Sequence, residues 1–170
     1  TGLPKEFRNS LYEHFRMDSL QLMNKQHSSD GSIKFLFGLD DGNSIEAVLI
    51  PEKNETGRMT LCISSQSGCA FGCKFCATGK IGFKKHLSPG EIVDQVLLAE
   101  KISGKEIDNI VFMGMGEPLH NYKNVVKAVR ILTDKLAPVI SPKRITVSTV
   151  GVASKILRLA EEGLGVKLAV

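Results

Sequence analysis

The chain has 170 residues, of which 42% are hydrophobic and 24% are charged, with a formal net charge of +4. This composition excludes a disordered chain and provides enough apolar material for one domain with a sizeable core, while the mild basic excess is compatible with an anionic partner. No apolar run reaches membrane-spanning length and no charged start precedes an apolar block, so we expect a soluble, cytoplasmic protein with no membrane partner.

The first segment is predicted to be helical. Across residues 1–25, Phe7, Leu11 and Phe15 recur every four positions on one face, and Pro4 stands near a helix start. We therefore expect the end of an N-terminal helical accessory region.

A β-hairpin is predicted next. Two strand-like runs, 33–39 and 44–50, are joined by the turn residues 40–43, and a polar, turn-rich linker covers 51–57. The chain is therefore divided into the helical accessory region, the hairpin with its linker, and a main domain, which cover 1–27, 28–57 and 58–170.

Strand-like and helical segments alternate in the main domain. The predicted strands cover 59–65, 109–113, 143–149 and 166–170, and the predicted helices run from Pro89 to Gly104, over 121–134 and over 153–162. Such repeats predict parallel strands with right-handed crossovers. Because no helix follows the fourth strand, we expect an α/β fold that is a partial (β/α) barrel, truncated in that strand.

The first of these helices has the clearest boundaries. Ser88 is a candidate N-cap, Pro89 occupies the first helical position, and Glu91 stands three residues after the cap, where it completes a capping box. Gly104 is placed to end the helix.

Three of the four cysteines lie in one short stretch. Cys69, Cys73 and Cys76 are separated by three and then two residues, on a predicted loop whose turn residues let all three sulfurs point at one centre. Without signs of export, this clustering favours a metal or reactive site over a disulfide framework. A four-iron cluster takes one cysteine per iron, so three cysteines leave one iron open to a ligand. The alternative is a structural zinc site that also uses Cys62.

The spacing of these cysteines resembles the signature of the radical S-adenosylmethionine (SAM) superfamily. Neighbouring segments are similar, more specifically, to the RNA adenosine C2-methyltransferases known as RlmN, with the Cfr group as relatives; these segments are 45–51, 61–69, 76–83, 114–119 and 146–151. The resemblance extends from about Leu3 to the last residue. It implies a radical SAM barrel and favours a [4Fe–4S] cluster over zinc.

The resemblance implies that Cys69, Cys73 and Cys76 hold the cluster, that the open iron binds SAM, and that an electron splits SAM to a 5′-deoxyadenosyl radical. One SAM methylates a cysteine near the family's C-terminus, and a radical on that methyl group adds to C2 of an adenine. Cys62 aligns with a second cysteine, which helps to remove the C2 proton and resolves the protein–RNA crosslink, leaving a disulfide. Since no cysteine follows Cys76, we expect this chain alone to be inactive.

The same resemblance assigns further site residues. Gly116 and Glu117 match positions that bind the cationic amino end of SAM, and Ser148 matches a SAM-contacting serine. Glu46 aligns with a glutamate proposed as a proton acceptor. Each of these residues also has an ordinary interpretation. Gly116 and Glu117 could belong to an acidic loop, and Ser148 could simply end a strand. Glu46 could be an exposed strand glutamate, and Cys62 a small buried filler.

The implied partners are RNA and an external electron donor. An adenosine of 23S rRNA is the implied substrate, with transfer RNA as a further candidate. Unless the cysteine loop is simply a solvated basic loop, its lysines and aromatic rings fit RNA: Lys74, Phe75, Lys80, Phe83, Lys84, Lys85 and His86. Two other functions stay open, a Cfr-type methyltransferase acting at C8 and a non-catalytic, zinc-stabilised RNA-binding module. The oligomeric state is also open, with a monomer expected for the longer enzyme.

Overall fold

The structure, a computed structural model, describes residues 2–15, 19–53, 57–136 and 139–170. The strands are β1 (Leu20–His27), β2 (Ile33–Leu39), β3 (Ser44–Pro51), β4 (Met59–Cys62), β5 (Gln66–Ser67), β6 (Lys85–His86), β7 (Asn109–Phe112), β8 (Ile145–Ser148) and β9 (Lys167–Ala169). The helices are α1 (Lys5–His14), α2 (Ala77–Ile81), α3 (Pro89–Ser103), α4 (Tyr122–Leu132) and α5 (Ala153–Glu161), with a short 3-10 turn at Pro142–Arg144.

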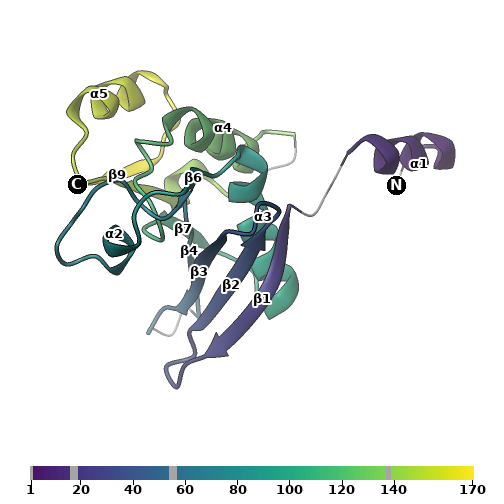
Figure 1. Ribbon diagram of the computed structural model, residues 1–170. Coiled ribbons are helices and arrows are strands. Elements are labelled where there is room, and N and C mark those ends of the chain that lie inside the picture. Colours follow the sequence, from purple (N-terminus) through teal and green to yellow (C-terminus); the bar gives the residue numbers. More distant parts are fainter. Residues whose placement is uncertain (1, 16–18, 54–56, 137–138) are drawn as a thin grey trace.

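One mixed sheet organises these elements (Figure 1). Its seven strands lie in the order β1-β2-β3-β4-β7-β8-β9. The pairs from β1 to β4 are antiparallel, and the pairs from β4 to β9 are parallel. Strands β5 and β6 form a separate two-stranded ribbon. The α/β class, the hairpin and the partial barrel of parallel strands are thus confirmed.

Alternation along the strands separates two faces of the sheet. Leu61 and Ile110 are register partners with 0% exposure, and they join side chains of α3 and α4 in one hydrophobic core. Cys62, Val111 and Thr146 are also register partners, but they are only half-buried and lie on the opposite face. We call this second surface the open face.

The prediction of a helix over residues 1–25 is wrong in its second half. Helix α1 ends at His14, and Leu20–His27 form strand β1 instead. Only Leu20 of β1 is buried, so the strand gives no alternating pattern to read. Its antiparallel pairing with β2 forms it, and such pairing overrides local propensity. Residues 1 and 16–18 of the predicted helix, and 54–56 of the predicted linker, lie outside the described residues.

The division into three domains stays a prediction. Strands β2 and β3, which it assigns to a separate hairpin, continue the sheet of the main domain, because Pro51 of β3 pairs with Met59 of β4. In the part of the chain that the structure describes, no helix is both long enough and apolar enough to pass through a bilayer.

The predicted capping box of α3 is confirmed. The Ser88 hydroxyl accepts a hydrogen bond from the backbone N–H of Glu91 at 3.2 Å, and the Glu91 carboxylate accepts one from the N–H of Ser88 at 2.7 Å. Gly104 ends the helix in the left-handed conformation. These boundaries fix where α3 begins beside the β5–β6 ribbon.

We expect Ser88→Ala to lower the free energy of unfolding by about 1 kcal/mol, because the N–H of Glu91 loses its partner at the helix start. Urea denaturation measures the effect. Ser141→Ala is the matched control, since Ser141 precedes the 3-10 turn without capping it through its side chain, and its change should stay within about 0.5 kcal/mol. Equal losses in the two variants would contradict a capping contribution.

Candidate functional site

A cavity of about 550 Å³ lies where the parallel strands end. Its wall comes from the loops that follow β4, β7 and β8, which is the usual position of a ligand site in a sheet of parallel strands. Six predicted site residues line it: Cys69, Cys73, Cys76, Gly116, Glu117 and Ser148. The fold thus brings together residues that are far apart in sequence.

The cysteine loop is closed by backbone hydrogen bonds. The N–H of Cys69 donates to the carbonyl of Gly82 at 3.2 Å, and the N–H of Cys76 donates to the carbonyl of Cys73 at 3.0 Å. All three thiols are free and half-buried. Burial raises the pKa of the Cys69 thiol, and the neighbouring Cys76, Glu117 and Cys73 raise it further.

The donor set of three thiols is of the kind that binds iron–sulfur clusters, because soft thiolates match iron. Among the described residues, no three His, Cys, Asp or Glu side chains are gathered closely enough to hold one metal ion, so the sulfurs do not meet at a single point as the sequence predicted. A four-iron cluster binds each thiolate through a different iron, and its ligands need not converge on one ion. The alternative zinc site would also use Cys62, which does not line the cavity.

Glu117 connects two walls of the cavity. Its side chain is 3% exposed. One carboxylate oxygen accepts a hydrogen bond from the N–H of Leu119 at 2.9 Å, and the other accepts one from the N–H of Val150 at 2.9 Å. These bonds stabilise the carboxylate and fix the loop after β7 against the loop after β8. They place a buried negative group beside the cavity, where it suits a cationic ligand.

Gly116 is required by packing within the chain. Its φ is +95°, and an added Cβ would lie 2.4 Å from the Cβ of Gln66. The residues of the segment 114–118 give no sign of this neighbour. The space left by the missing side chain is therefore filled by Gln66, which packs directly against the turn.

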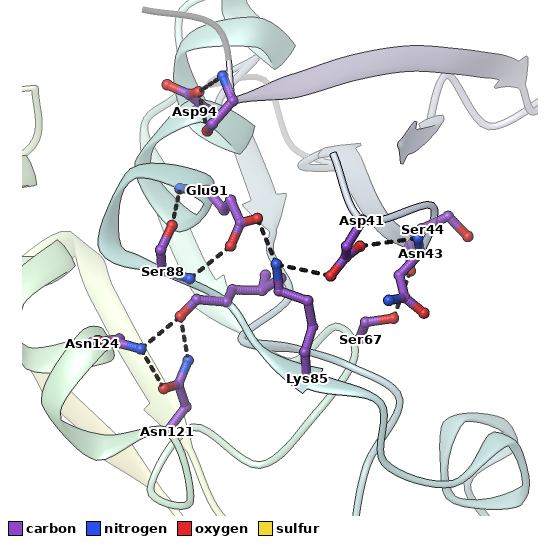
Figure 2. A network of polar contacts seen from close by, with 12 residues as sticks. Asp41, Asn43, Ser44, Ser67, Lys85, Ser88, Glu91, Asp94, Asn121 and Asn124 are labelled. Carbon is purple, nitrogen blue, oxygen red and sulfur yellow. Dashed lines mark hydrogen bonds and ion pairs between the residues drawn. The ribbon is translucent and has the colours of Figure 1, made fainter. Parts of the chain in front are cut away.

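A polar network connects the β5–β6 ribbon to the β2–β3 turn and to the beginnings of α3 and α4 (Figure 2). Lys85 forms ion pairs with Asp41 at 3.1 Å and with Glu91 at 2.9 Å. Burial opposes its charge, but the hydrogen bonds to these two carboxylates outweigh burial and raise the pKa of Lys85. The side-chain amide of Asn121 donates to the carbonyls of Ser65 and Leu87. Lys85 is thus engaged internally, unlike the other lysines predicted to meet phosphates.

The other lysines and two aromatic rings of this region are accessible, whereas His86 is half-buried. Phe75 is 93% exposed and Phe83 is 40% exposed, and Lys74, Lys80 and Lys84 are also exposed. Exposed rings among cations suit unpaired nucleic-acid bases, which stack on the rings while phosphates meet the lysines.

Cys62 and Glu46 lie outside the cavity wall but share the open face. Cys62 pairs in register with Val48, which is two residues from Glu46 on the same side of β3. Burial raises the pKa of the Cys62 thiol, although a hydrogen bond with the backbone of Met113 opposes the rise. Glu46 forms an ion pair with Lys34 at 2.7 Å. The structure therefore places both residues on the open face of the sheet, outside the cavity wall.

Gln66 is a further residue of this site that the sequence did not predict. This side chain is 0% exposed and accepts a hydrogen bond from the N–H of Glu117 at 2.8 Å. Its only sequence signal is its position seven residues before Cys73, inside the stretch that resembles a known family. Nothing local indicates that it meets residues 114–120.

Comparisons with known proteins agree on one family. The model of the "Radical SAM superfamily" matches residues 63–168. A probable dual-specificity RNA methyltransferase RlmN from Thermotoga neapolitana is 54% identical over 170 residues, which cover 99% of this chain and 49% of the relative. The protein of the same name from Thermus thermophilus is 49% identical, with 99% and 48% covered.

A solved structure shares the fold. The crystal structure of a radical SAM methyltransferase from Sphaerobacter thermophilus aligns with a TM-score of 0.89 and 42% identity, covering 98% of this chain and 49% of that one. The chain thus spans about half the length of the relatives it matches.

Proposed function

Because the chain belongs to the radical SAM superfamily, we propose that it is the cluster-binding half of an RlmN-type enzyme that methylates C2 of an adenosine in 23S rRNA. The observation that carries the proposal is the cavity at the strand ends, which three cysteines line together with Glu117 and Ser148. Relatives that are 48% to 54% identical are named RNA methyltransferases. Their dual specificity supports a second RNA substrate, for which transfer RNA is the candidate.

Cys69, Cys73 and Cys76 would hold a [4Fe–4S] cluster at this cavity, because soft thiolates match iron and the loop supplies three of them. When bound, the cluster supplies the electron that splits SAM into methionine and a 5′-deoxyadenosyl radical. The chain requires an external electron donor for this step. The cavity volume of about 550 Å³ is within the range of pockets that bind small-molecule ligands and cofactors such as SAM.

Glu117 and Gly116 would bind the amino end of SAM. The Glu117 carboxylate is already oriented by Leu119 and Val150, and each oxygen keeps a lone pair for a cationic donor. Ser148, at the end of β8, lines the same cavity and presents a hydroxyl to the ligand. These groups would fix the orientation of the sulfonium cofactor.

Cys62 would act as the resolving cysteine, with Glu46 as a candidate proton acceptor. Partial burial raises the pKa of the Cys62 thiol, so its reaction requires that the proton be removed. Glu46 forms an ion pair with Lys34 on the same open face. A methyl-carrying cysteine would lie in the part of the enzyme that this chain does not include.

The test compares this chain with a chimera, in which the chain is joined to the part of the Thermotoga neapolitana relative that it does not match. Both proteins are reconstituted anaerobically and incubated with SAM, a reductant and 23S rRNA. We expect 2-methyladenosine from the chimera and no methylated RNA from the chain alone. Product at C8 would assign the chain to the Cfr type. Methylation by the isolated chain would contradict the expectation that the reaction needs a methyl-carrying cysteine outside this chain.

A further inference from the structure

Gln66 joins two histidines to the turn that carries Glu117. It is buried at the start of β5 with 0% exposure. Its Oε1 accepts a hydrogen bond from the backbone N–H of Glu117 at 2.8 Å. Its Nε2 lies 3.0 Å from Nδ1 of His86 and 3.0 Å from Nδ1 of His120. One amide therefore contacts three partners from different segments.

This arrangement fixes the tautomer of both imidazoles. A backbone N–H can only donate, so the oxygen of the Gln66 amide must face Glu117 and the NH₂ group must face the histidines. Each Nδ1 must then accept, which places the ring protons of His86 and His120 on Nε2. Both rings are consequently neutral.

Protonation of either ring breaks the arrangement. A proton on Nδ1 would point an N–H at the NH₂ group of Gln66, so that a donor faces a donor. Rotating the amide would offer its oxygen to the imidazolium but turn NH₂ toward the N–H of Glu117. In both cases a buried group at the turn loses its partner.

The surroundings of His86 also favour a neutral ring. The two imidazoles lie 4.8 Å apart between centroids, and Phe83 packs against both at 4.9 and 5.6 Å. The Glu117 carboxylate is bound to backbone N–H groups rather than to an imidazole, and Lys85 adds positive charge beside His86 while its own partners are Asp41 and Glu91. Burial, with a smaller effect of His120, lowers the pKa of His86.

Gln66 also supports the turn through its backbone and its packing. Its N–H donates to the carbonyl of Met115 at 3.1 Å, and Gly116 has no side chain where the Gln66 side chain lies. A displacement of Gln66 would therefore move the cavity wall at Gly116 and Glu117.

We propose that Gln66 is a positioning residue that makes the placement of the Gly116–Glu117 turn depend on neutral His86 and His120, so that acidification loosens this wall of the cavity. The proposal goes beyond the proposed function, because it concerns hydrogen bonds within the chain and holds whatever ligand the cavity binds.

The test is imidazole and amide NMR of the ¹⁵N-labelled chain. At pH 7.5 we expect both His86 and His120 as the Nε2–H tautomer. As the pH falls toward 5, the amide resonance of Glu117 should shift with the same midpoint as the ring of His86. The proposal would be overturned by an Nδ1–H tautomer at either ring, or by an amide resonance of Glu117 that does not shift as the histidine rings titrate.

Gln66→Glu is the diagnostic variant, because it keeps the shape and replaces the NH₂ group with a second acceptor. The carboxylate should raise the titration midpoint of His86 by about one pH unit or more and should abolish the linked shift of the Glu117 amide. His27, exposed on β1, is the internal reference, and its ring resonances should be the same in both proteins. An unchanged His86 midpoint would refute the coupling, and if the variant does not fold, the wild-type tautomers still decide.

Discussion

Replacing Cys73 with alanine is expected to abolish iron loading of the anaerobically reconstituted chain. A four-iron cluster that binds only three protein thiolates cannot lose one of them without losing most of its affinity, since no other described cysteine lines the cavity. Bound iron should fall from about four per chain to less than about one, and the brown absorbance of the reconstituted protein should disappear. Iron analysis and visible absorption measure the result.

Cys62→Ala is the matched control. Cys62 is also a half-buried free thiol, but it lies on the open face and not in the cavity wall. This variant should keep the iron content and colour of the unmodified chain. A colourless protein that binds one tight zinc, and loses it equally in both variants, would instead support the zinc-stabilised module.

The second large effect is expected from Gly68→Ala. Gly68 has a φ of +72°, and an added Cβ would lie 1.8 Å from the carbonyl oxygen of Gly82. That oxygen accepts the hydrogen bond from the N–H of Cys69, so it cannot move without opening the cysteine loop. The backbone overlap and the unfavourable φ together should lower the free energy of unfolding by about 3 kcal/mol or more. Urea denaturation measures the loss.

Gly104→Ala separates the two causes. Gly104 has a φ of +66°, and nothing lies within 4 Å of an added Cβ. The Gly104→Ala variant should lose only about 1–2 kcal/mol of its free energy of unfolding, which is the cost of the left-handed conformation. If the two variants were equally destabilised, the contact between Gly68 and Gly82 would have no separate effect.

Sequence reasoning succeeded where the determining contacts are local. The capping box of α3 depends on Ser88 and Glu91, three positions apart, and the strands of the parallel sheet are short apolar runs between turn residues. The cysteine loop is also local, and its position next to Glu117 follows from the rule that loops at the carboxyl ends of parallel strands meet.

It failed where distant segments determine the structure. Strand β1 exists because β2 offers it a partner, and its exposed side chains give no pattern. The contacts of Gln66 with His86 and His120 span 20 and 54 residues. No spacing rule predicts them. Roles for Cys62 and Glu46 rest on family resemblance, and the fold adds only that they share a face.

The bridge that Glu117 makes between Leu119 and Val150 has a kinetic consequence. A carboxylate that is already held by two separate segments does not have to reorganise when a cation arrives, because folding has preorganised it. Ligand capture at this wall should then be governed by diffusion into the cavity and not by a slow rearrangement of the loops. Selectivity for a cationic ligand would then arise from the charge and the orientation that the Glu117 carboxylate has before the ligand binds.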